Sequence, residues 1–134
     1  MSAVDFEQWA APDLKITFGG RVYTVPPPTV EASAQVLATA ALAELRFGLV
    51  RGEVPAEVQA VLETIGTSHP ALSQDVYEQM VADNVPAMTI DRLAVYASMF
   101  WARGAEYASA FARLLWTPRD TEGEPSGGGA SPKA

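Results

Sequence analysis

The sequence contains no cysteine and a single histidine, His69. Without cysteine, the chain forms no disulfide, no zinc site with thiolate ligands and no thiol nucleophile. One histidine is too few for a metal site with several histidine ligands. The sequence also offers no combination of a nucleophile, a general base and an oxyanion-stabilising group. We therefore expect no enzymatic activity, no metal and no cofactor, and we assign His69 a structural place in a loop.

Basic residues and long apolar runs are also scarce. Nine Lys and Arg stand against 16 Asp and Glu, giving a net charge of -7, which argues against a nucleic-acid partner. The longest charge-free stretch, residues 32–43, is short of the ~20 apolar residues that cross a bilayer. The acidic start of the chain lacks the basic and apolar regions of a secretory signal. These absences predict a soluble cytoplasmic protein with neither a nucleic-acid nor a membrane partner.

Length and composition predict one domain followed by a tail. The chain has 134 residues, of which 49% are hydrophobic, enough for a single core. Residues 119–134 are rich in Gly, Ser and Pro and contain no large apolar side chain. We expect a helical domain over residues 1–118 and a flexible, disordered tail over residues 119–134.

Near the start, the sequence has the pattern of a β-hairpin over residues 14–25. Residues 14–18 and 21–25 alternate apolar and polar side chains, and Gly19-Gly20 between them suits a two-residue turn. This turn pairs Phe18 with Arg21 and predicts one apolar face. That face comprises Leu14, Ile16, Phe18, Tyr23 and Val25.

Helical periodicity dominates the chain after the three prolines at 26–28. Helices are expected at about 29–47, 55–65, 71–83 and 89–102, and from Gly104 to 116, with Thr29 and Thr89 as N-caps. We therefore predict a mainly α fold, a bundle of four to five helices with an N-terminal β-hairpin.

Phe6 and Trp9 are expected to dock on the body. The first long helix is expected to bury the stripe Val30, Ala34, Leu37, Ala41 and Leu45.

The segment from Ile90 to Ala102 is apolar on nearly all sides, so it is either the central helix or a contact with another chain. Methionines and aromatic rings in this half of the chain have two interpretations. They form the core, or part of them lines a groove that receives a partner helix, as adaptable Met-rich grooves do. The candidate partner-binding residues are Met88, Tyr96, Met99, Phe100, Trp101, Phe111 and Trp116.

Two blocks of sequence resemble the tail assembly chaperones of long-tailed (siphovirus-type) phages that infect actinobacteria. The first is LKITFGGRVYTVPPP at residues 14–28. The second is YEQMVADNVP at residues 77–86, followed by an apolar helix containing Phe100-Trp101 and the restart GAEYA at residues 104–108. The sequence departs from the family at Asn84, where Gly is frequent, and at Pro86, where Trp often follows the Val. Asn tolerates the same left-handed backbone as Gly.

The resemblance implies that the protein binds other proteins in the host cytoplasm and is absent from the mature virion. Such chaperones bind the tape measure protein, keep it soluble and assist tail tube assembly, and the major tail protein is a further partner to consider. It also leaves self-association and a longer, frameshifted product open. Two alternatives remain at this point: a structural tail or head-tail joining protein of the virion, and a small prophage or host regulatory interaction protein.

Overall fold

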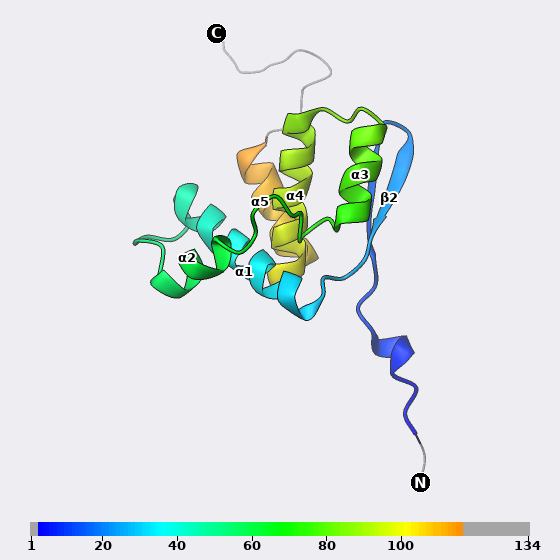
Figure 1. Cartoon of the computed structure of the whole chain (residues 1–134), viewed down its shortest axis with the longest axis horizontal. Helices are drawn as coiled ribbons and strands as arrows, with labels where there is room; N and C mark the ends of the chain where they lie inside the picture. The colour runs from blue at the N-terminus through cyan, green and yellow to red at the C-terminus, as the bar shows by residue number, and fades with distance from the viewer. Residues whose placement is uncertain (1–2, 117–134) are drawn as a thin grey trace.

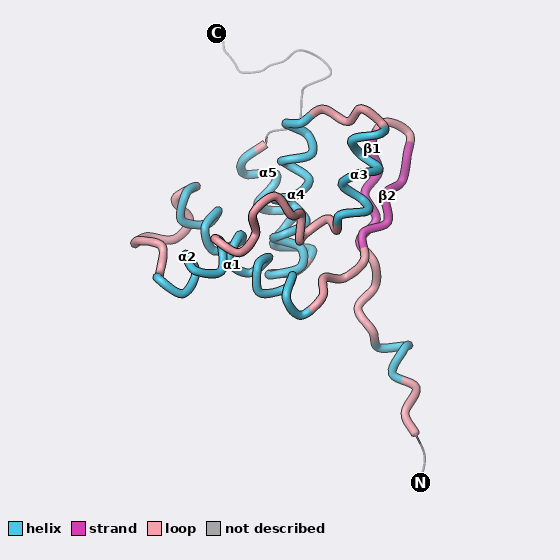
Figure 2. The backbone as a smooth tube through the Cα atoms, viewed as in Figure 1, coloured by secondary structure: helices cyan, strands magenta, loops and turns pink. Residues whose placement is uncertain are grey.

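The computed structural model describes residues 3–116 and confirms a mainly α fold with an N-terminal hairpin (Figure 1). A short 3-10 helix, Phe6–Trp9, precedes the two strands, and Figure 2 shows the helices gathered on one side of the hairpin. The predicted tail, residues 119–134, lies outside the described residues. The strands are β1 (Leu14–Phe18) and β2 (Arg21–Val25); the helices are α1 (Val30–Arg46), α2 (Ala56–Leu62), α3 (Gln74–Ala82), α4 (Ala87–Arg103) and α5 (Ala105–Leu115).

The hairpin has the predicted antiparallel register, with Phe18 opposite Arg21. Gly19 and Gly20 have φ values of 62° and 79°, the positive values that a tight hairpin turn requires at both central positions. Four members of the predicted apolar face are buried, but Phe18 is 38% exposed because it lies beside the turn, at the tip of the hairpin. The hairpin therefore delivers one apolar face to the core, as expected, except at its tip.

A polar contact fastens the hairpin to the end of α3. The hydroxyl of Tyr23 donates to Oδ2 of Asp83 at 2.7 Å, and Arg21 forms an ion pair with the same carboxylate. Asp83 is the C-cap residue of α3, so the contact joins residues 60 positions apart in sequence. The hydrogen bond from Tyr23, helped by Arg21, lowers the pKa of Asp83.

Helix α4 is central to the fold. One cluster of buried residues joins the hairpin, α1, the segment before α3, α3 itself and α4, and includes Leu72 and Met80. A second cluster joins α1, α4 and α5 through Ala40, Met99 and Phe111, among others. Side chains of α4 pack against both clusters, which explains why apolar residues surround this helix on all sides.

The buried face of α1 differs from the predicted stripe. Val30 is 92% exposed and Leu37 is 48% exposed, whereas Val36, Ala40 and Ala43 are buried. The small alanines allow α1 to lie close against α4, and larger side chains of the predicted stripe point elsewhere. The predicted N-cap of α4 was also wrong, because the helix begins at Ala87, two residues before Thr89.

Residues 3–13 form an N-terminal arm that extends away from the helices (Figure 1). The expectation that Phe6 and Trp9 dock on the body is wrong: they are 66% and 62% exposed. The two rings pack edge to face on each other, with centroids 5.6 Å apart. Asp5 caps this turn by accepting a hydrogen bond from the Glu7 amide at 3.1 Å. The arm therefore has local structure without contributing to the core.

Among the described residues, no helix combines the length and apolar character needed to span a membrane.

The observed core predicts that Leu→Ala substitutions at two positions lower the free energy of unfolding by different amounts. Leu72 is fully buried, so Leu72→Ala should lower the free energy of unfolding by about 2–5 kcal/mol. Leu37→Ala, on the predicted but exposed stripe of α1, should cost less than about 1 kcal/mol, since alanine favours helix. Urea unfolding of both variants measures the difference. Equal losses would contradict the observed orientation of α1.

Candidate functional site

The largest gathering of exposed apolar side chains lies where the end of α1 meets α5. We define the α1–α5 apolar surface as the large residues in this region that are 37% to 64% exposed. They are Phe47, Leu49, Val50, Tyr107 and Leu114. Leu49, Tyr107 and Leu114 line a hollow of about 240 Å³ together with Ala110 and Phe111.

The termination of α1 places three of these side chains. Phe47 is the C-cap, and Gly48 follows with a φ of 79°, a value at which a side chain would be strained. The amides of Leu49 and Val50 both donate to the Glu44 carbonyl, at 2.9 and 3.2 Å. These bonds fold the chain back against the end of the helix, so three apolar side chains are held on a short, fixed turn.

Helix α5 supplies the other side of the surface. Its residues 107, 110, 111 and 114 follow the spacing of one helical stripe. The Phe111 ring, almost fully buried, lies below the surface and meets the rings of Phe47 and Tyr107 at centroid distances of 5.8 and 6.4 Å. The exposed residues of the surface thus pack on an aromatic ring of the core.

A buried carboxylate fixes the edge of the surface. Arg103 donates two hydrogen bonds to Glu44, at 3.0 and 2.9 Å, and the Tyr107 hydroxyl donates to the same carboxylate at 2.6 Å. The bonds from Arg103 lower the pKa of Glu44; burial acts against them, and the bond from Tyr107 lowers it further. Because Tyr107 is held by this network, its ring has a defined position on the surface.

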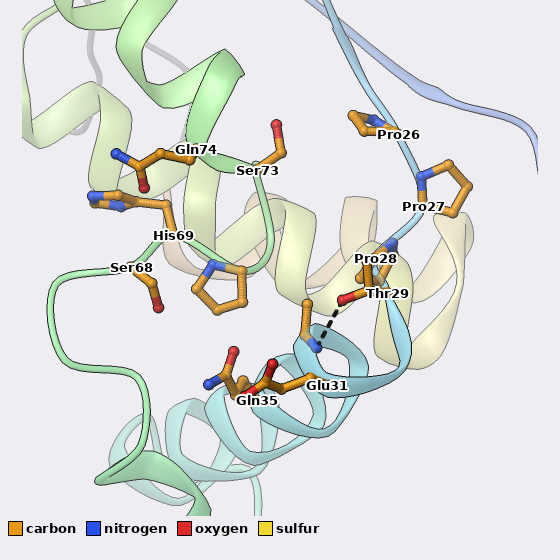
Figure 3. Close-up of a pocket in the computed structure, with 12 residues that line it drawn as sticks. Pro26, Pro27, Pro28, Thr29, Glu31, Gln35, Ser68, His69, Ser73 and Gln74 are labelled. Atoms are coloured by element: carbon orange, nitrogen blue, oxygen red, sulfur yellow. Dashed lines mark hydrogen bonds between the residues drawn. The ribbon is translucent and has the colours of Figure 1, made fainter.

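Further hollows surround His69, in the connection between α2 and α3. One, of about 270 Å³, lies between the three prolines at 26–28, the start of α1 and the start of α3 (Figure 3). Another, of about 390 Å³, lies between His69, α3 and α4. The imidazole stacks on Tyr77 with ring centroids 3.5 Å apart. Burial lowers the pKa of His69, and the negative charge of Asp91 raises it by a smaller amount. The ring therefore packs on α3 and lines these hollows, and its structural role in the loop stays a prediction.

The polar groups in these hollows do not assemble a recognisable reaction centre. In Figure 3, Ser68, His69 and Ser73 come from the segment leading into α3, and Gln74 is the first residue of that helix. The Thr29 hydroxyl oxygen accepts a hydrogen bond from the Ala32 amide and so caps α1. Across residues 3–116, no group of three or more His, Asp and Glu side chains is arranged to hold a metal.

The candidate partner-binding residues do not form one surface. Met88 is 72% exposed, whereas the four aromatic residues Tyr96, Phe100, Trp101 and Trp116 are half-buried. Met99 and Phe111 are both buried in the second core cluster; Met99 is fully enclosed, whereas Phe111 also lines the hollow of the α1–α5 apolar surface. The indole N–H of Trp101 donates to the Ala71 carbonyl at 3.0 Å, which gives this ring a structural partner.

Sequence reasoning missed most of the α1–α5 apolar surface. The signal was present in Phe47, Leu49 and Val50, three large apolar residues around a helix-ending glycine. It was also present in Tyr107 and Leu114, seven residues apart and therefore on one side of α5.

The structure is a small helical domain with one group of exposed apolar side chains at the end of α1 and on α5. A family model described as a domain of unknown function (DUF7426) matches residues 4–134, and the chain belongs to this family. Comparison with curated proteins and with solved structures gave no match.

The Glu44 network predicts a pH-dependent substitution effect. Arg103→Met leaves a buried carboxylate with a single Tyr107 bond and should cost about 1–3 kcal/mol of stability at neutral pH. The pKa of folded Glu44 lies below its ordinary value of 4.5, so its contribution is complete above that pH and is lost as pH falls through the folded-state pKa. In the variant, burial raises the pKa of Glu44, so acid destabilises the variant less and the cost of the substitution should shrink.

Urea unfolding at neutral pH and at the lowest pH where both proteins stay folded measures this change. Arg113→Met, at an exposed arginine of α5, is the matched control and should show a small cost at both pH values. A cost for Arg103→Met that is the same at both pH values would contradict the role assigned to Arg103.

Proposed function

We propose that this protein is a phage tail assembly chaperone that binds the tape measure protein through the α1–α5 apolar surface. In this role it acts in the host cytoplasm, keeps its client soluble and assists assembly of the tail tube. The observation that carries the proposal is the group of five large exposed apolar side chains at α1 and α5, three of which line one hollow. The resemblance of residues 14–28 and 77–108 to such chaperones supplies the identity of the client.

The size of the surface fits weak, repeated binding. A hollow of about 240 Å³ suits an apolar side chain or two from a client helix, with the flanking rings covering the rest of its apolar face. Burying one large apolar side chain is worth about 1.5–3 kcal/mol, so a single contact is weak. A long helical client offers many such contacts, and each chaperone bound to it covers another stretch.

Charge supports the same role. The chain has a net charge of -7, so a client coated with several copies acquires a large negative charge. Like-charged coated clients repel one another, which opposes aggregation. The α1–α5 apolar surface thus provides attachment, and the acidic remainder of the chain provides solubility.

Co-expression with a tape measure protein tests the proposal. Leu114→Asp places a charge on the surface at a residue 64% exposed, so folding should be preserved while the soluble fraction of the client falls to the level without chaperone. Val81→Asp, at a 50% exposed residue of α3, is the matched control and should keep the client soluble. Urea unfolding confirms that both variants fold.

Two outcomes would reject the proposal. A client that stays as soluble with Leu114→Asp as with the unchanged chain would remove the α1–α5 apolar surface from the mechanism. Mass spectrometry of purified phage particles gives the second: stoichiometric presence of this chain in mature tails would identify a structural tail protein instead.

A further inference from the structure

The N-terminal arm exposes two aromatic rings that contribute nothing to the core. Every residue from 3 to 13 is exposed, and Phe6 and Trp9 are already packed edge to face in a capped turn. Exposed aromatic clusters of this kind act as anchors in protein interfaces, because they bury much area and lose little conformational freedom. The arm therefore has the features of a docking segment.

Charge makes the arm complementary to the α1–α5 apolar surface. Residues 3–13 contain Asp5, Glu7 and Asp13 and no basic residue, so the arm carries a charge of -3. The segments that build the surface, residues 44–53 and 103–116, contain four arginines and three glutamates, a net charge of +1 in a chain of -7 overall. The arginines are Arg46, Arg51, Arg103 and Arg113. Opposite charge and matching apolar character favour this pairing over other exposed surfaces.

The arm does not meet this surface within one molecule. Figure 1 shows the arm leaving from the end of the hairpin that adjoins the start of α1, whereas the end of α1 and helix α5 lie on the other side of the body. Residues 117–134, which follow α5 directly in sequence, contain no large apolar side chain that could serve as an anchor. An arm that docks on the α1–α5 apolar surface must therefore come from a second copy of the chain.

We propose that the N-terminal arm of one molecule docks on the α1–α5 apolar surface of a second copy, placing Phe6 and Trp9 over the hollow. The arm carboxylates lie near the arginines of α5 and of the turn after α1. The interaction covers the surface when no client is present, and client binding displaces the arm. Self-association through the arm does not depend on which client the surface receives.

Each molecule carries one arm and one surface, so the contact is heterologous. Such a contact produces chains of molecules or closed rings, and a reciprocal exchange of arms produces a dimer. In every case self-association requires both partners of the contact, which makes complementation between variants possible.

Sedimentation velocity of the full chain over a range of concentrations tests the inference. The unchanged protein should show concentration-dependent oligomers. Phe6→Ser with Trp9→Ser removes the anchors, and Leu114→Asp adds a charge that repels the acidic arm; each variant should weaken self-association on the order of 100-fold. Met88→Ser, at a 72% exposed apolar residue outside both partners, should leave it unchanged.

Mixing the two variants gives the decisive readout. The arm variant keeps an intact surface and the Leu114→Asp variant keeps an intact arm, so an equimolar mixture should form a 1:1 complex and nothing larger. A monomer at all concentrations, an association that the arm variant leaves intact, or a mixture that stays monomeric would each overturn the inference. Client solubility with the arm variant is expected to be retained, so failure of the inference is distinguishable from failure of the proposed function.

Discussion

The fold depends on the position of α4 between the two core clusters. Apolar residues surround most of this helix, and it packs against both clusters, with Ile90, Ala97, Ser98 and Met99 buried. Tyr96, Phe100 and Ala102 lie against both clusters and so connect the hairpin half of the core to the α5 half. The hairpin, α1, α3 and α5 each contribute one face to this enclosure.

Enclosing one helix leaves apolar side chains at the periphery. A domain of this size buries a limited fraction of its surface, so residues outside the enclosure remain in contact with water. Single exposed apolar residues such as Val30 need no special explanation, but five large ones in one region, three of them lining one hollow, do. The buried Glu44 network holds this region in place from the inside, because Arg103 and Tyr107 reach the same carboxylate from α4 and α5.

Local patterns predicted the elements, whereas long-range packing decided which faces they bury. The hairpin register follows from Gly19-Gly20 and alternation, both local in sequence, and the structure confirms it. The face of α1 was not predictable in this way, because an alanine-rich helix has no single strong apolar stripe and the partner of Glu44 lies 59 residues away. Local sequence could not predict the binding residues for the same reason. Met99 and Phe111 have side chains suited to binding, but their burial depends on how α1, α4 and α5 pack together.

Coverage by a second copy differs physically from coverage by a segment of the same molecule. A cover within one molecule acts at a fixed effective concentration and competes with the client under all conditions. A cover from a second molecule acts only when the protein concentration approaches the dissociation constant of the contact, so dilute molecules keep the surface available. In the proposed chaperone, an arm acting between molecules would cover the α1–α5 apolar surface where collisions are frequent and leave it available to a client when molecules are dilute. The acidic charge of the arm adds to this selectivity, because it disfavours surfaces that lack neighbouring arginines.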